Sequence, residues 1–157
     1  MDIKLKSYLE ENKIWYNVYP HPAVFTVKES KSIKEKIPGA HTKCLFLKDE
    51  SNSFYLVALP AEKRLDIKSL KTKLNLKELH FASPEELKKE LHLTPGSVSI
   101  FGMIYSLSVF LIIDKALWSS ALVGFHPNIN TSTLVLDHKN LVKFYNSISA
   151  RKEVIEL

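Results

Sequence analysis

Two segments of the chain place polar residues that can do chemistry at the ends of apolar runs. In the first, His41, Lys43 and Cys44 stand directly before Leu45-Phe46-Leu47. In the second, the apolar residues 122–125 lead into His126-Pro127-Asn128-Ile129-Asn130. Side chains at the end of a buried strand are held by rigid backbone, which is what a binding or catalytic group needs. The two segments together predict a polar pocket built on a sheet.

Lys43 and its neighbour Cys44 can each be interpreted in two ways. A lysine fixed at the mouth of a strand can present its ammonium to a phosphate, a carbonyl or a developing oxyanion. The alternative is an ordinary solvated lysine, in a chain that has many. Because side chains alternate along a strand, Cys44 is expected on the opposite face, where a lone cysteine is usually a small core residue. A thiol nucleophile would need a nearby base, for which His41 or His126 is available.

The loops at His126 and Gly96 are the other candidate sites. An imidazole and the amide of Asn130, held by a proline, can hydrogen-bond a sugar hydroxyl, a carbonyl or a water. The alternative is a turn whose asparagines satisfy their own backbone. Gly96-Ser97 can offer backbone N–H groups to an anion, although this segment lacks the lysine and the spacing of a phosphate-binding P-loop. The six histidines are scattered without metal-ligand spacing, so no metal site is predicted.

Length and charge narrow the class of protein. The 157 residues, 45% of them hydrophobic, suffice for one domain with a sizeable core. The net charge of +5 fits a polyanionic partner, and it also fits a proteome rich in lysine. Only Arg64 and Arg151 are arginines, and lysines suit diffuse attraction to phosphate better than the reading of bases. Specific recognition of duplex DNA is therefore not expected.

The sequence also bears on disulfides and membranes. A single cysteine excludes an intramolecular disulfide and a cysteine-based zinc cluster. Residues 1–13 lack the uninterrupted apolar core of a signal peptide. The most apolar stretch, residues 103–113, is interrupted by Ser106 and Ser108 and is shorter than a membrane span of roughly 20 residues. We expect a soluble, cytoplasmic protein that does not contact membranes.

The pattern of apolar residues predicts a single α/β domain, residues 1–157, with a mixed and mostly antiparallel sheet. Helices are expected after Asp2, from the capping-box pattern Thr26–Glu29 to Lys36, after Asp66, after Ser83-Pro84 and after Asp137. Strands are expected at residues 15–19, 43–48, 54–59, 79–82, 122–125 and 131–136, and strand-like segments at 97–113 with a break near Ser106. The strands at 43–48 and 54–59 are expected to form a hairpin.

Six motifs, in this order and spacing, resemble those of a known family. They are HPAVFTV at 21–27, HTKCLFLKD at 41–49, LVALPAEKR at 56–64, FASPEEL at 81–87, TPGSV at 94–98 and FHPNINT at 125–131. The chain resembles the YbaK/ProX family of aminoacyl-tRNA deacylases, and within it the free-standing prolyl-tRNA editing proteins that act on Ala-tRNA(Pro). The resemblance spans nearly the whole chain and needs all six motifs, since none is specific alone.

The resemblance implies a barrel-like mixed sheet surrounded by helices, with no metal and no organic cofactor. It implies hydrolysis of the ester that joins a wrong amino acid to tRNA(Pro), and prolyl-tRNA synthetase as a further partner. The functional residues that it carries over are Lys43, Gly96 and His126. Around them, residues expected to contact or shape the bound substrate are His41, Cys44, Ser97, Ile100 and Asn130.

Two positions depart from the pattern of the family. Its members usually have asparagine where this chain has Cys44, and many have proline where it has Ile100. Losing the amide removes a hydrogen-bond donor and an acceptor, and losing the ring frees the loop backbone. The leading interpretation is an enzyme that edits mischarged tRNA. The alternative is a module of the same fold that binds the acceptor end of tRNA, or a synthetase, without turnover.

Overall fold

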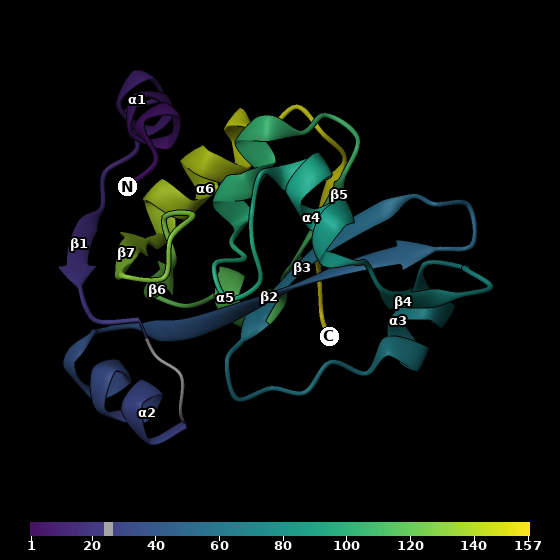
Figure 1. The fold of residues 1–157 in the computed structure, drawn as a ribbon, viewed down its shortest axis with the longest axis horizontal. Helices are drawn as coiled ribbons and strands as arrows, with labels where there is room; N and C mark the ends of the chain where they lie inside the picture. Colours follow the sequence, from purple (N-terminus) through teal and green to yellow (C-terminus); the bar gives the residue numbers. More distant parts are fainter. Residues whose placement is uncertain (24–26) are drawn as a thin grey trace.

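A single mixed sheet with helices around it organises the chain (Figure 1). The structure is a computed structural model that describes residues 1–23 and 27–157, of which residues 27–30 by their backbone alone. The helical segments are α1 (Ile3–Glu11), α2 (Val27–Lys36), α3 (Ile67–Lys73), α4 (Pro84–Leu91), the 3₁₀ helix η1 (Ile100–Tyr105), α5 (Lys115–Trp118) and α6 (His138–Ser147). The predicted fold class, mixed α/β with helices around one sheet, is confirmed.

The sheet contains eight strands among the described residues. They are β1 (Asn17–Pro20), β2 (Ala40–Asp49), β3 (Phe54–Pro60), β4 (Leu79–Phe81), β5 (Phe110–Asp114), β6 (Leu122–Phe125), β7 (Ser132–Asp137) and β8 (Lys152–Ile155). The spatial order is β1-β7-β6-β2-β3-β5-β8, with β4 paired to β2. The pairs β2–β6, β3–β5 and β5–β8 are parallel and the other pairs are antiparallel.

The hairpin of β2 and β3 crosses the centre of the molecule and separates two hydrophobic cores (Figure 1). Cys44 and Phe46 point into the larger core, which also contains buried residues of α1, α4, η1 and α6. Leu47, one residue further along β2, points into the smaller core, which includes Leu70 of α3. This is the alternation expected of a strand that is buried on both faces. The predicted hairpin is confirmed, and β2 begins three residues earlier than expected.

The helix starts follow from their capping residues. The carboxylate of Asp2 accepts a hydrogen bond from the N–H of Lys4, and Asp66 and Asp137 make similar contacts at α3 and α6. At α4, Ser83 and Glu86 form a complete capping box. These four predictions are confirmed. The helix expected to run to Lys36 is confirmed as α2, whereas Thr26 and the side chains of the expected capping box Thr26–Glu29 lie outside what the structure describes.

The prediction was wrong in the first half of residues 97–113. We expected extended segments there, and Ile100–Tyr105 instead forms the 3₁₀ helix η1. The hydroxyl of Ser99 caps this turn by accepting a hydrogen bond from the N–H of Phe101, 3.2 Å away. A short apolar run can be buried in either conformation, so its periodicity does not distinguish them. The short helix α5 and the last strand, β8, were not expected.

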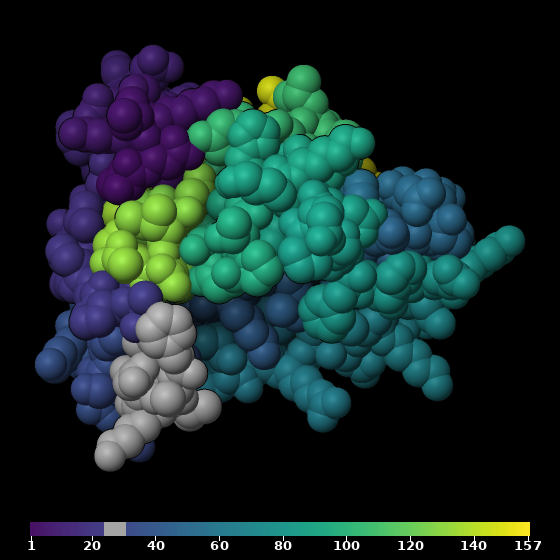
Figure 2. All heavy atoms as spheres, viewed as in Figure 1, coloured from purple at the N-terminus to yellow at the C-terminus, as the bar shows by residue number. Residues whose placement is uncertain are grey.

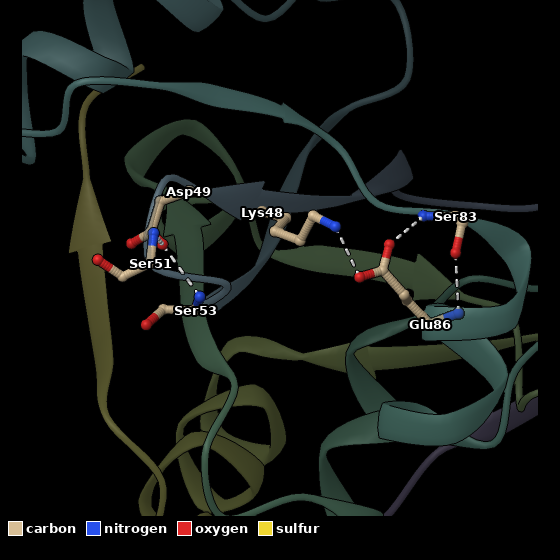
Figure 3. Close-up of polar contacts among 6 residues, drawn as sticks. All are labelled: Lys48, Asp49, Ser51, Ser53, Ser83 and Glu86. Carbon is tan, nitrogen blue, oxygen red and sulfur yellow. Dashed lines mark hydrogen bonds and ion pairs between the residues drawn. The ribbon is translucent and has the colours of Figure 1, made fainter.

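Two polar networks fix the far end of β2 (Figure 3). The ammonium of Lys48 lies 2.8 Å from Glu86 Oε2, so the strand is joined to the capping box of α4. Next to it, the buried carboxylate of Asp49 accepts hydrogen bonds from the N–H groups of Ser51 and Ser53 and from the hydroxyl of Tyr55. This carboxylate closes the turn between β2 and β3. The far end of the strand is thereby held at several points.

In the part of the chain that the structure describes, no helix combines the length and the apolar character needed to cross a membrane.

Candidate active site

Two hollows open at the near end of β2, where the polar residues of the first motif lie. One is a small cavity of about 70 Å³, and we call it the histidine cavity. It is lined by His21, Ile33, Lys34, Ile37, His41, Thr42, Gly124, His126 and Thr133. The other is an open groove of about 680 Å³, lined by Lys43, Leu45, Arg64, Leu65, Asp66, Ile67 and Phe81. Thr42 and Lys43 are consecutive residues, so one strand contributes to both hollows.

Glycines allow the strands to meet closely at the histidine cavity. Gly39 has φ +90°, and a Cβ there would lie 2.7 Å from the Cβ of Leu122. Only glycine therefore fits the approach of β2 to β6, where His41 pairs with Gly124. The hydroxyl of Thr42 donates a 2.6 Å hydrogen bond to the carbonyl of Gly124 and fastens the two strands together.

Hydrogen bonds assign the tautomers of two histidines in this cavity. His126 Nδ1 lies 3.1 Å from the carbonyl oxygen of Ser132, which can only accept, so Nδ1 carries the proton. The same argument applies to His21, whose Nδ1 lies 2.9 Å from the carbonyl of Pro22. His21 Nε2 then accepts from the hydroxyl of Thr133 at 3.0 Å. In neutral His126 the other nitrogen, Nε2, has a lone pair that can accept a proton or orient a water.

The cavity favours neutral imidazoles. Burial lowers the pKa of His126, and the nearby His21 ring, 5.9 Å away between centroids, lowers it further. The hydrogen bond to Ser132 opposes this shift in part. Burial also lowers the pKa of His41. At neutral pH both side chains are therefore suited to accept protons.

Lys43 lies in the groove, on the face of β2 opposite Cys44. The alternation predicted for these two residues is confirmed. Cys44 is 9% exposed, and burial raises the pKa of its thiol to about 12. A thiol with this pKa is almost entirely protonated at neutral pH, so it is a poor nucleophile. The structure favours a core role for Cys44.

The Gly96 loop contacts the His126 loop through Asn130. Gly96 has φ +90°, and a Cβ there would lie 4.0 Å from Asn130 Nδ2. The N–H of the next residue, Ser97, donates to the carbonyl of Thr94 and is thus occupied within the loop. Ile100 is fully buried and packs in the same core as Cys44. The two positions that depart from the resemblance are thus both core positions.

The structure brings some of the predicted site residues together and separates others. His41 and His126 share one cavity, and Gly96 lies beside Asn130. Lys43 lines the groove rather than that cavity. Sequence reasoning missed His21, which lies 105 positions before its partner His126; both precede a proline, and that shared pattern was the available signal. Among the described residues, no group of three or more His, Cys, Asp or Glu side chains is arranged to hold a metal ion.

Comparison with known proteins assigns the family. The model of the aminoacyl-tRNA editing domain matches residues 21–144. Prolyl-tRNA editing protein ProX of Acetoanaerobium sticklandii is 35% identical over 95% of this chain and 93% of its own. Prolyl-tRNA synthetase associated domain-containing protein 1 of Xenopus laevis is 30% identical over 90% of this chain and 88% of its own.

A solved structure shares the fold across the whole chain. It is described as a proposed trans-editing enzyme for prolyl-tRNA synthetase, and it superposes with a TM-score of 0.74 at 18% identity. The superposition covers 100% of this chain and 99% of that one. The resemblance seen in the six motifs is confirmed: the chain belongs to the aminoacyl-tRNA editing domain family and is an aminoacyl-tRNA hydrolase.

Proposed function

We propose that this chain, acting as one editing domain over residues 1–157, hydrolyses mischarged tRNA(Pro), with Ala-tRNA(Pro) as its preferred substrate. The observation that carries the proposal is a cavity of about 70 Å³ that adjoins Lys43 along β2. A cavity of this size suits the methyl side chain of alanine. The similarity to ProX supports the choice of tRNA(Pro), and the errors of prolyl-tRNA synthetase would supply the substrate.

The reaction is the hydrolysis of an activated ester. A water oxygen attacks the carbonyl carbon, and the carbonyl electron pair moves onto oxygen to form an oxyanion. When this intermediate collapses, the bond between the carbonyl carbon and the ribose oxygen breaks. A proton from the attacking water ends on the ribose oxygen, which leaves a free amino acid and a tRNA with its terminal hydroxyl. Such a reaction needs a positioned water and a stabilised oxyanion more than it needs a protein nucleophile.

We assign the central role to Lys43. Its ammonium would anchor the terminal nucleotide or the ester carbonyl from the groove, and it would stabilise the negative charge that develops on oxygen. In the part of the chain that the structure describes, the two ion pairs are Lys48–Glu86 and Lys63–Asp114, so Lys43 is not neutralised by either.

The remaining predicted residues receive supporting roles. His126 Nε2 would accept a hydrogen bond from the attacking water, and His41 would line the cavity beside it. The N–H of Gly96 would assist at the oxyanion, with Asn130 holding the loop in place. Ser97 would hold the same loop through its bond to Thr94. Cys44 and Ile100 would shape the wall from the core side.

Size would provide the selectivity against proline. The proline side chain has two more carbons than that of alanine, and it closes back onto the amino nitrogen. Each methylene supplies only about 1–3 kcal/mol of discrimination in an apolar pocket. A cavity too small to admit the ring does more, because a steric clash within a packed fold is not relieved by small adjustments.

The test is a panel of Ala-, Cys-, Ser- and Pro-tRNA(Pro) presented to the wild type and to Ile33→Ala, which enlarges the cavity wall. We expect the wild type to hydrolyse Ala-tRNA(Pro) fastest and Ile33→Ala to gain activity on Pro-tRNA(Pro). The matched control is Ile104→Ala, another half-buried isoleucine, which lies outside the cavity and should keep the wild-type preference. Tight tRNA binding without turnover of any substrate would establish the non-catalytic module instead.

A further inference from the structure

Two segments of 18 residues, 31–48 and 63–80, each have a net charge of +4, and the second lies beside the groove that contains Lys43. Residues 63–80 contain six lysines and arginines and two acidic residues, a net charge of +4, against +5 for the whole chain. This segment covers α3 and leads into β4. In Figure 2 the teal part of the chain that contains α3 and β4 occupies the lower right of the molecule, and long side chains project from it into solvent. A local concentration of this kind attracts a polyanion to one face.

The charged segment continues the groove that contains Lys43. Arg64, Asp66 and Ile67 line that groove, and Ile67 also lines a second, open hollow of about 640 Å³. The second hollow is lined further by Lys68, Lys71, Lys77, Glu78, Leu79 and His80. Ile67 is thus common to the linings of the two hollows. Their linings follow α3 from Lys43 and Arg64 to Lys71 and Lys77, and we call the two hollows together the α3 track.

Most of the cations on the α3 track are available to a ligand. Lys63 is paired with Asp114, 3.0 Å away, and Lys73 donates to the backbone carbonyl of Glu156. The other basic residues of the segment, Arg64, Lys68, Lys71 and Lys77, take part in neither of the two ion pairs formed among the described residues. On the acidic side, Asp66 is engaged as the N-cap of α3, where it accepts from the N–H of Ser69.

An exposed aromatic ring stands at the start of this track. Phe81, the last residue of β4, is 58% exposed although it lines the groove next to Lys43 and Arg64. A ring that is exposed to this extent has a face available for stacking. An aromatic face beside a cationic groove is the combination that single-stranded nucleic acids use: bases stack on the ring while phosphates contact the cations.

We propose that the α3 track binds the single-stranded 3′ end of the tRNA, with Phe81 stacking on a base near the terminal adenosine and Arg64, Lys68 and Lys71 contacting the phosphates behind it. The inference rests on the proposed function, because Lys43 at the head of the track is where the ester would lie. The track would hold the strand and set its direction. Its residues would not contact the reacting atoms, which would lie against Lys43 and the histidine cavity.

The decisive test measures binding separately from hydrolysis. Uncharged tRNA(Pro) and a short 5′-labelled RNA that ends in CCA are titrated against the wild type, Phe81→Ala and Lys68→Gln/Lys71→Gln. We expect Phe81→Ala to weaken binding roughly 5- to 150-fold, the range found when one stacked base loses its platform. For the double variant we expect the slope of log K against log salt to fall by about 1.4, since each phosphate contact on a single strand contributes about 0.7.

Matched variants elsewhere serve as controls. Lys6→Gln/Lys139→Gln removes the same charge from exposed sites on α1 and α6, which lie away from α3 in Figure 1, and Trp15→Ala removes an exposed ring from the β1 side. These variants should bind RNA like the wild type. Phe81→Trp, which keeps an aromatic ring, should bind it more tightly than Phe81→Ala and about as well as the wild type. In hydrolysis the track variants should raise KM and leave kcat unchanged.

Two results would overturn the proposal. One is a set of track variants that bind RNA with the affinity and salt slope of the wild type. The other is an equal loss in the track variants and in the control variants, since that would show only a general effect of charge. A wild type that binds the RNA through the track but hydrolyses no aminoacyl-tRNA would refute the proposed function and leave the track intact.

Discussion

The two ends of β2 use similar residues for different purposes. At the far end, Lys48 is paired with Glu86 (Figure 3). The carboxylate of Asp49 accepts hydrogen bonds from Ser51, Ser53 and Tyr55. At the near end, Lys43 faces an open groove and His41 faces a cavity. Asp49 and Lys43 are only six positions apart on the same strand, so the difference arises from their surroundings and not from the strand itself.

The comparison shows how one strand can serve stability at one end and, with the role proposed for Lys43, chemistry at the other. At the far end the polar groups are paired with one another, which fixes the turn and joins the strand to α4. The same strand continues to the near end, where Lys43 lines an open groove and His41 lines a cavity. A site held within a fraction of an ångström needs support of this kind behind it.

The largest effect on activity should come from replacing Lys43 with alanine, and the same replacement at Lys48 provides the comparison. We expect Lys43→Ala to lower kcat/KM for the mischarged tRNA about 100- to 1,000-fold, the usual cost of losing one group that stabilises an oxyanion. Its thermal stability should match that of the wild type. Lys48→Ala should do the reverse, with near-normal kcat/KM and a loss of up to about 1 kcal/mol in the free energy of unfolding. Comparable kcat/KM values for the two variants would refute the assignment of a catalytic role to Lys43 and a structural role to Lys48.

An intermediate effect is expected at Asp49. Asp49→Ala removes the acceptor for two backbone N–H groups and a tyrosine hydroxyl, so the free energy of unfolding should fall by about 2–3 kcal/mol. Denaturant titration measures this loss. Asp137→Ala removes an exposed helix cap and serves as the control, with a loss of about 1 kcal/mol. An equal loss in both variants would contradict the special role of the Asp49 network.

The Asp49 network also gives stability a dependence on pH. Burial raises the pKa of Asp49, but hydrogen bonds from Tyr55, Ser53 and Ser51 outweigh that effect, and the pKa lies below the usual 3.8. The folded-state pKa is lowered, so this contribution is present above the unfolded-state pKa. It is lost as pH falls through the folded-state pKa. Asp49→Ala should therefore lose less stability than the wild type on acidification below about pH 4.

The smallest effect should appear in the pH profile of hydrolysis. The pKa of His126 lies below 6.5, so the rate should be independent of this group at neutral pH and should fall as pH drops through that pKa. One pH unit below it, the rate should be about one tenth of the plateau. The background hydrolysis of the ester, which rises with pH, is subtracted at each point. His126→Gln should lose this acidic limb and His41→Gln should keep it; the opposite pattern would assign the proton to His41.

Much of the fold could be predicted from local signals. Capping residues located α1, α3, α4 and α6, and the apolar runs on either side of residues 49–53 located the central hairpin. Local signals failed at Ile100–Tyr105, where a buried apolar run is as compatible with a 3₁₀ turn as with a strand. They also failed at the short strand β8, which is stabilised by parallel pairing with β5.

The site was harder to predict than the fold because it depends on distant contacts. The motifs indicated His41, Lys43 and His126, but the spacing of histidines along the chain gave no sign that His21 packs beside His126. Strand alternation correctly placed Lys43 and Cys44 on opposite faces. It could not show that the face of Lys43 lines an open groove while the face of Cys44 is covered by a core. That information resides in β4 and α3, which follow much later in the sequence.

The bond between Thr42 and Gly124 has a consequence for how the protein becomes active during synthesis. It joins residues 82 positions apart, and it belongs to the parallel contact that brings His41 toward His126. Contacts between such distant parts of a chain are slow to form. A nascent chain that has not yet released residues 122–133 from the ribosome already has Lys43 but lacks one wall of the histidine cavity. Selectivity that depends on this cavity, as proposed above, can therefore arise only after residues 122–133 have been synthesised and have folded against β2.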